Sequence, residues 1–289
     1  MGNELKPLRE VINDATASAV WGMEGTGKTI LVLRYWPLPI AVLNYDRPLT
    51  MAHLSVLDDE RIDAIQVMNV REAIKDIDHD EAKFIKDITE KTINENLTPL
   101  KGGTLLLDGG TLYRAVLKMA DPKLAADADA NKKSNPREKE RVNAYIKQLV
   151  SHVQDMGVNF VITAHAAWEW KMVADSNGNS SLQQTKSVYP QLDQPWFQAT
   201  NISLLLFKRC ECGRNIVSQD GSCSLAGEGP MSAPTAGHQG RQHIARIVGN
   251  KFNTQTEGTE WKNVTYEDLR RLSFDPIRAE LMLEAKKGK

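Results

Sequence analysis

The octapeptide GMEGTGKT, from Gly22 to Thr29, has residue types at a spacing suited to holding phosphate groups. It fills every fixed position of the pattern G-x-x-x-x-G-K-[ST]. Its glycines allow a tight backbone turn whose N–H groups can point at phosphate oxygens. Lys28 supplies a mobile positive charge, and Thr29 supplies a hydroxyl for Mg²⁺. We therefore expect a phosphate-binding loop made of Gly22, Met23, Glu24, Gly25, Thr26, Gly27, Lys28 and Thr29.

The segments on either side of this loop fit the same interpretation. The apolar run 17–21 before it is typical of a short buried strand, and Ile30 to Leu33 after it open a buried helix that Pro37 must end. A helix that starts at the loop adds its N-terminal dipole to phosphate binding. The alternative is a glycine-rich turn with an incidental lysine, and the strand–loop–helix setting argues against it.

Two acidic residues follow other apolar runs. Asp108 ends the run LLLD, where an aspartate can hold Mg²⁺; the alternative is an ordinary Asp-Gly turn. Asp46 follows LNY, and ligands of a parallel sheet lie at the carboxyl ends of its strands. A carboxylate there could orient and activate a water that attacks phosphorus, or it could only form a turn with Arg47 and Pro48.

A histidine ends a third apolar run, VITAH. A lone histidine is usually structural, but His165 at a strand end could touch the terminal phosphate of a nucleotide and report its presence.

Length and composition indicate one domain. A chain of 289 residues suits an α/β domain with insertions, and 41% hydrophobic residues can bury a sizeable core. A net charge of −1 gives no overall basic surface for nucleic acid, although a local groove can still be basic. Without a secretory leader or an apolar run that could span a bilayer, we expect no membrane partner. An odd number of cysteines, three, favours a reducing cytoplasm over a disulfide framework.

Apolar runs and helical patterns alternate along the chain. We expect strands at 17–21, 40–43, 62–67, 104–107, 160–163 and 202–207, and a further strand at 244–248. The clearest helix has Val142, Ile146, Leu149 and Val153 on one face, starts near Pro136 and ends at Gly157. Such alternation predicts an α/β fold with a mostly parallel sheet and helices on both faces.

Three segments lack periodicity. We expect mobile loops or an extended hairpin among them, and we place mobile loops at 121–135 and 174–187 and an irregular insertion at 210–242. Short helices should cover 265–285, with Thr265 and Asp268 capping one and Asp275 and Pro276 opening the other.

The order of these motifs resembles that of the RecA-like P-loop ATPases. Closest are the phage-encoded members that assist single-strand annealing recombination; the segments GVNFVITAH and ARIVGNKFNT look especially like theirs. The resemblance covers about residues 14–270. It implies a RecA-like core, ATP and Mg²⁺ as ligands, and ATP hydrolysis on single-stranded DNA during recombination, annealing or replication. It also implies a bacterial or phage-infected cell, a ring or filament of identical subunits, and a single-strand binding protein or annealing partner.

Residue roles carry over from this resemblance position by position. Lys28 and Thr29 would bind phosphate and Mg²⁺, with Asp108 supporting the metal. Asp46 would replace the family's catalytic glutamate with a side chain one methylene shorter, and His165 would stand where recombinases carry a glutamine switch. The hydroxyl residue usual after the second acid is absent, since Gly109 and Gly110 come first and Thr111 follows.

Family members complete the nucleotide site with a cation from the neighbouring subunit, which stabilises charge in the transition state. Arg246 and Lys251 are our candidates, with Lys208 and Arg209 next. The alternative for each is a solvated surface charge.

The segment after His165 combines aromatic and basic residues. Trp168, Trp170, Lys171 and Lys186 lie within an otherwise polar stretch. Aromatic rings stack on bases and lysines follow phosphates, which suits single-stranded DNA. The alternative is that the tryptophans pack against the edge of the sheet.

Cys210, Cys212 and Cys223, with His238 and His243, could hold zinc, but the C-x-C spacing is not the usual one, and free thiols are the alternative. Three other functions stay open: a helicase or helicase loader, a small-molecule P-loop kinase, and a nucleotide-gated assembly protein without turnover. Duplex unwinding would favour the first, phosphate transfer to a metabolite the second, and an incompetent Asp46 the third.

Overall fold

The computed structural model describes residues 15–70, 78–120, 136–174, 180–192, 194–210, 215–216 and 241–274. The strands are β1 (Ala17–Gly22), β2 (Ile40–Asn44), β3 (Ile65–Asn69), β4 (Thr104–Asp108), β5 (Asn159–Ala174), β6 (Ser180–Pro190), β7 (Ile202–Cys210), β8 (Asn215–Ile216), β9 (Arg241–Asn250) and β10 (Glu260–Lys262). The helices are α2 (Lys28–Tyr35), α3 (Met51–Leu54), α4 (Asp59–Asp63), α5 (His79–Asn96), α6 (Gly110–Ala120), α8 (Pro136–Asp155), α9 (Gln194–Ala199) and α10 (Tyr266–Phe274), with a 3₁₀ turn at Thr254–Thr256.

One mostly parallel sheet organises the described residues. Its strand order is β10-β9-β7-β1-β5-β4-β2-β3, with β6 paired to β5 and β8 paired to β7. The strands from β7 to β3 in this order run parallel, whereas β9 and β10 extend one edge in antiparallel fashion. The central strands are buried and mostly apolar, because helices shield them from water on both sides.

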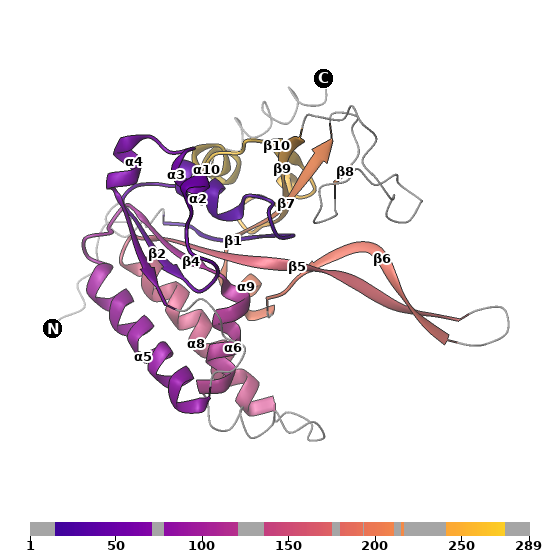
Figure 1. Ribbon diagram of the computed structural model, residues 1–289, viewed down its shortest axis with the longest axis horizontal. Coiled ribbons are helices and arrows are strands. Elements are labelled where there is room, and N and C mark those ends of the chain that lie inside the picture. The colour runs from indigo at the N-terminus through magenta and orange to yellow at the C-terminus, as the bar shows by residue number, and fades with distance from the viewer. Residues whose placement is uncertain are drawn as a thin grey trace.

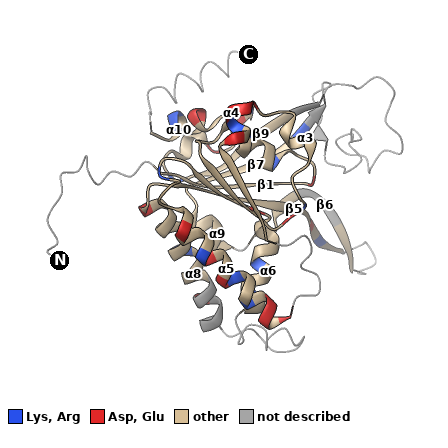
Figure 2. Ribbon diagram, turned by 60° about the vertical axis from the view of Figure 1, so that its left-hand side comes forward, with Lys and Arg blue, Asp and Glu red and all other residues tan. Residues whose placement is uncertain are grey.

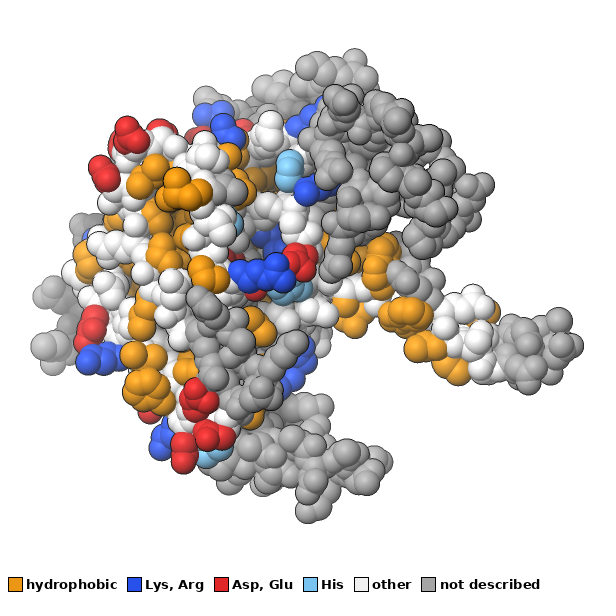
Figure 3. All heavy atoms as spheres, in the orientation of Figure 1, with side chains coloured by type: hydrophobic (Ala, Val, Ile, Leu, Met, Phe, Trp, Pro, Cys, Tyr) orange, Lys and Arg blue, Asp and Glu red, His pale blue; other side chains and the backbone are white. Residues whose placement is uncertain are grey.

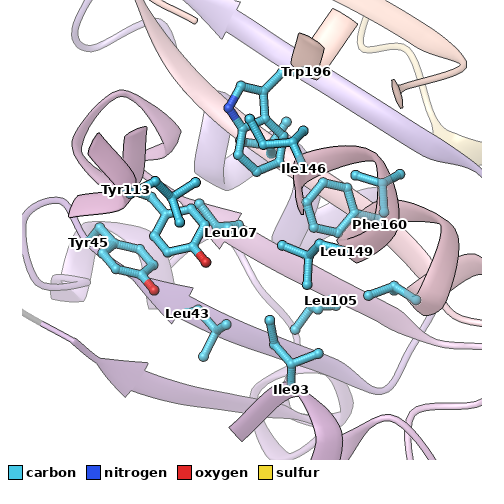
Figure 4. Packing of buried hydrophobic residues seen from close by; sticks show 14 of the residues in the cluster. Leu43, Tyr45, Ile93, Leu105, Leu107, Tyr113, Ile146, Leu149, Phe160 and Trp196 are labelled. Carbon is cyan, nitrogen blue, oxygen red and sulfur yellow. The ribbon is translucent and has the colours of Figure 1, made fainter. Parts of the chain in front are cut away.

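Helices cover the two faces of the sheet, as the sequence predicts (Figure 1). One face packs on α5, α6, α8 and α9, where Tyr113, Phe160 and Trp196 belong to one cluster of buried side chains (Figure 4). The other face packs on α2 and α10, which contribute Val32, Leu33 and Leu269. Charged residues gather on the flanking helices and are nearly absent from the central strands (Figure 2). No described helix has the length and apolar character needed to cross a membrane.

Most strands start near where the sequence places them, but two starts differ by three residues: β9 begins earlier than expected, at Arg241, and β3 begins later. The strand expected at 62–67 begins at Ile65, because Asp58 caps α4 by accepting a hydrogen bond from the Arg61 N–H. The cap draws residues 59–63 into a helix instead.

Helix ends also follow their predicted signals. Helix α8 begins at Pro136 and ends before Gly157, whose φ of 76° lies in the left-handed region. Thr265 and Asp268 cap α10 through reciprocal hydrogen bonds. The expected loop at 121–135 and the expected second C-terminal helix after residue 274 lie outside the described residues.

Residue 174 and residues 180–187, where we expect a mobile loop, lie instead in an extended hairpin, the alternative for the irregular segments. Strand β5 continues past residue 163 to Ala174, and β6 pairs with it in antiparallel fashion from Ser180 to Pro190. The two strands project from the body of the molecule (Figure 1). Most of the expected insertion at 210–242 lies outside the described residues, but Cys210 ends β7, β8 pairs with β7, and Arg241 opens β9.

Candidate active site

Polar residues meet at the carboxyl ends of the parallel strands. Gly22 of β1 lies beside His165 of β5, and Asn44 of β2 lies beside Asp108 of β4. Because β5 lies between β1 and β4, His165 stands between the glycine-rich loop and the two strands that carry the acids. This edge of a parallel sheet is where ligands bind in α/β proteins.

The glycine-rich loop connects β1 to α2, in the setting that the sequence predicts. Gly25 and Gly27 have φ angles of 72° and 84°, which residues with side chains rarely adopt. A Cβ on Gly22 would lie 2.3 Å from the Leu206 carbonyl oxygen, so no larger residue fits there. The Thr26 hydroxyl donates to the Met23 carbonyl at 2.8 Å and tightens the turn.

Lys28 folds back into this loop. Its Nζ donates to the carbonyl oxygens of Gly22 and Met23, at 3.2 and 3.1 Å. Burial lowers the pKa of Lys28, and the nearby carboxylate of Asp108 opposes the shift. An ammonium held only by neutral carbonyls would gain strength from an anionic partner, because hydrogen bonds between charged groups are stronger.

Asp108 is the centre of a buried hydroxyl–carboxylate cluster. The Thr29 hydroxyl donates to its two oxygens, at 3.0 and 2.9 Å, and the Thr163 hydroxyl donates to Oδ1 at 2.5 Å. Burial raises the pKa of Asp108, and these hydroxyl hydrogen bonds oppose the shift only in part. A positive charge next to this carboxylate would therefore stabilise its ionised form.

These residues fit Mg²⁺ held mainly by nucleotide phosphates. The described residues contain no group of three or more His, Cys, Asp and Glu side chains that could hold a metal by themselves. Mg²⁺ at phosphate sites needs only one or two protein oxygens besides phosphate and water. Asp108 is buried, partly buried Thr29 is hydrogen-bonded to it, and Lys28 is next to Thr29, so Thr29 and Asp108 can supply those oxygens.

Asp46 and His165 form a pair above the loop. Asp46 Oδ2 lies 3.0 Å from His165 Nε2. The hydrogen bond from His165 lowers the pKa of Asp46, with partial burial opposing it. The turn after β2 is held by Asn44, whose side chain contacts the Asp46 N–H and the Arg47 carbonyl at 3.0 and 3.1 Å. The Asn44 side chain therefore supplies the hydrogen bonds of this turn, and the Asp46 carboxylate hydrogen-bonds with His165.

The position directly after Asp108 holds a glycine rather than the hydroxyl residue expected from the resemblance, and the structure shows why. Gly109 has a φ of 94°, and a Cβ there would lie 3.0 Å from the Asp46 backbone nitrogen. This close approach brings Asp46 beside Asp108. The Thr111 hydroxyl accepts the His165 N–H at 3.2 Å, and Thr163 supplies the hydroxyl to Asp108 instead.

Two further residues reach the loop from the antiparallel edge of the sheet. His243 of β9 has its Nδ1 2.9 Å from the Thr26 carbonyl oxygen. Lys208 of β7 pairs with His243 in register, and its Nζ lies 3.9 Å from the position of a Cβ on Gly25. The sequence marks His243 only as a possible zinc ligand. Cys212, Cys223 and His238 lie outside the described residues.

The two cations proposed to act on a neighbour lie away from the loop. Arg246 donates to Glu260 of β10 at 3.1 and 2.5 Å and lies 5.4 Å from the Phe207 ring centre. Strand alternation places it on the face opposite Ala245, which packs with α2. Lys251 lies at the other end of β9, where its Nζ donates to the Gln198 carbonyl. The contacts of both side chains lie outside the glycine-rich loop.

The β5–β6 hairpin exposes large apolar side chains on one face. Trp170, Met172 and Leu182 are exposed by 53%, 65% and 59%, and Met172 pairs directly with Leu182. Lys171 alternates to the other face, where it lies 3.6 Å from Glu169. Figure 3 shows hydrophobic side chains along the projecting hairpin. Trp168 is only partly exposed near its base, and the side chain of Lys186 lies outside the description.

No protein-family model matches the chain, and no curated protein matches it significantly.

Proposed function

We propose that this protein is an ATP-binding and ATP-hydrolysing enzyme with a RecA-like core that acts on single-stranded DNA in recombination, annealing or replication. One observation carries the proposal: Lys28, Asp108 and Asp46 converge at the carboxyl edge of a parallel sheet, although they lie far apart in the sequence. The electrostatic influence of both acids on Lys28 shows how near they are. The resemblance in motif order supports ATP as the nucleotide.

Each residue then has a role in binding. Lys28 exchanges the carbonyls of Gly22 and Met23 for phosphate oxygens. Thr29 and Asp108 would hold Mg²⁺, which neutralises charge on the phosphates during transfer. Burial raises the pKa of Asp108 despite its hydroxyl hydrogen bonds and the nearby Lys28, so its ionised form is disfavoured in the free protein. Binding of a cation beside it removes that penalty.

Asp46 and His165 would act on the attacking water. Because its pKa is lowered, Asp46 stays ionised at neutral pH and accepts a hydrogen bond from that water. A carboxylate of low pKa is a weak base, so its main effect is to orient the water toward phosphorus. His165 fixes the Asp46 carboxylate and lies at the base of the hairpin, so it can couple the state of the nucleotide to that hairpin.

The proposed DNA contact is the β5–β6 hairpin. Trp170 presents an exposed ring on which a base can stack. Because Lys171 lies on the opposite face beside Glu169, stacking rather than phosphate contact should dominate at this position. We also propose a ring or filament, in which Arg246 or Lys251, whose contacts lie outside the loop of their own subunit, would act on the nucleotide of a neighbour.

The test is ATP hydrolysis with and without single-stranded DNA, run beside duplex unwinding and phosphate transfer to metabolites. Hydrolysis stimulated by single strands supports the proposal. Unwinding of duplex would instead indicate a helicase, and transfer to a small molecule would indicate a kinase. Hydrolysis that ignores DNA would contradict the DNA-directed part of the proposal.

A further inference from the structure

His243 touches the phosphate-binding loop from outside the motif. It lies on β9, 217 positions from Thr26 in the sequence, yet its Nδ1 is 2.9 Å from the Thr26 carbonyl oxygen. A Cβ on Gly27 would lie 3.3 Å from the same Nδ1 and 3.4 Å from Cε1. The imidazole therefore packs directly against the Thr26–Gly27 peptide.

The chemistry of this contact fixes the tautomer. A carbonyl oxygen only accepts hydrogen bonds, so Nδ1 must carry a proton and donate it. The contact does not use Nε2, so the ring holds the loop through one defined nitrogen.

The same contact fixes the direction of the Gly27 N–H. A trans peptide is planar, and its C=O and N–H point in opposite directions. With the Thr26 carbonyl held toward His243, the Gly27 N–H must point away from β9. Backbone N–H groups are the phosphate ligands of such a loop, and Gly27 has a left-handed φ of 84°, at which a peptide can easily rotate in the absence of a restraint.

We propose that His243 is a positioning residue of the nucleotide site: it holds the Thr26 carbonyl and so keeps the Gly27 N–H directed at a phosphate oxygen of a nucleoside di- or triphosphate. This inference rests on the proposed nucleotide-binding function. Lys208, opposite His243 in the β7–β9 pairing, adds positive charge on the same side of the loop. Through His243 and Lys208, the strands β9 and β7 thus contribute residues to one side of the proposed nucleotide site.

The experiment compares three substitutions at this position by calorimetric binding of Mg-ADP. His243→Asn places an amide N–H near the position of Nδ1, His243→Gln extends its amide toward the position of Nε2, and His243→Ala has no donor. We expect Ala to weaken binding about tenfold, the effect of one hydrogen bond of roughly 1.4 kcal/mol. Asn should restore affinity to within about twofold, and Gln should restore less.

Matched controls separate this effect from general damage. His152→Ala removes an exposed histidine of α8 that contacts Asn94 at 3.2 Å, and it should bind like the wild type. Thermal melting without nucleotide checks that each variant folds. If His243→Ala unfolds, the comparison of Asn with Gln decides, because both keep a polar side chain of similar size.

The outcomes distinguish this inference from the function on which it rests. If the wild type binds Mg-ADP and Lys28→Ala does not, the phosphate loop functions as proposed. Should His243→Ala then bind like the wild type, or Asn fail to restore affinity in a folded protein, the positioning role is wrong. If the wild type itself does not bind, the proposed function fails and the inference with it.

Discussion

Asp46 Oδ2 and His165 Nε2 lie 3.0 Å apart, although 119 positions separate the two residues in the sequence. Strands β5, β4 and β2 lie side by side and bring them together, and Gly109 makes room for the backbone of Asp46. The pair gives the site an ionised acceptor of fixed orientation. Its position between the phosphate loop and the hairpin is the basis of the proposed link between nucleotide and DNA.

Asp46→Asn should slow ATP hydrolysis by about 10²-fold and leave nucleotide affinity nearly unchanged. The amide is similar in size and keeps one oxygen, but it lacks the charge that orients water. Steady-state turnover and calorimetric binding of a non-hydrolysable analogue measure the two effects. Equal losses in both would mean that Asp46 only supports the loop structure.

Asp108→Asn should raise the melting temperature of the nucleotide-free protein at neutral pH while abolishing stabilisation by Mg-nucleotide. Burial raises the pKa of Asp108, so the ionised carboxylate destabilises the fold. The stability that this group contributes is complete below the pKa of the unfolded chain and is lost as the pH rises through the higher folded pKa.

The difference between the melting temperatures of Asp108→Asn and the wild type should therefore shrink as the pH falls from neutral toward 4, near the unfolded pKa. Calorimetric melting across this range measures it. A difference that stays constant with pH would contradict the assignment of the effect to the charge of Asp108.

Gly109→Ala should destabilise the protein more than Gly102→Ala. Both glycines have positive φ, 94° and 82°, so each alanine carries a backbone cost of about 1–2 kcal/mol. Only at Gly109 would the new Cβ press on Asp46, because a Cβ on Gly102 meets nothing within 4 Å. Gly109→Ala should also slow hydrolysis. Equal melting temperatures and equal turnover for the two variants would show that the close approach to Asp46 has no consequence.

Trp170→Ala should weaken binding of single-stranded DNA by about 1–3 kcal/mol and leave hydrolysis without DNA unchanged. Phe84→Ala is the control, since it removes another exposed aromatic ring, on α5. Fluorescence anisotropy with a labelled oligonucleotide reports the affinity. If the two variants bind DNA equally well, the hairpin is not a stacking platform.

The sequence predicts those parts of the site that follow from local pattern. Lys28 and Thr29 belong to a fixed motif, and Asp46, Asp108 and His165 each follow an apolar run, so strand ends alone indicate them. Thr163 had a weaker signal, as a lone hydroxyl within a buried strand.

Other contacts depend on strand order, which periodicity does not reveal. His243 reaches the loop only because β9 pairs with β7 and β7 pairs with β1. Pairing of β9 with β10 likewise places Arg246 beside Glu260. The hairpin is similar, since polar residues in 174–187 suggest a loop, yet those from Ser180 onward pair with β5 and form β6.

The most direct test of the nucleotide site is Mg²⁺-dependent release of phosphate from ATP by the purified protein, compared with Lys28→Ala and with Lys91→Ala. Lys91 is an exposed lysine that pairs with Glu95 on α5, far from the loop in sequence. We predict release that requires Mg²⁺, is lost in Lys28→Ala and persists in Lys91→Ala. Release that survives Lys28→Ala, or no release under any condition, would contradict the account.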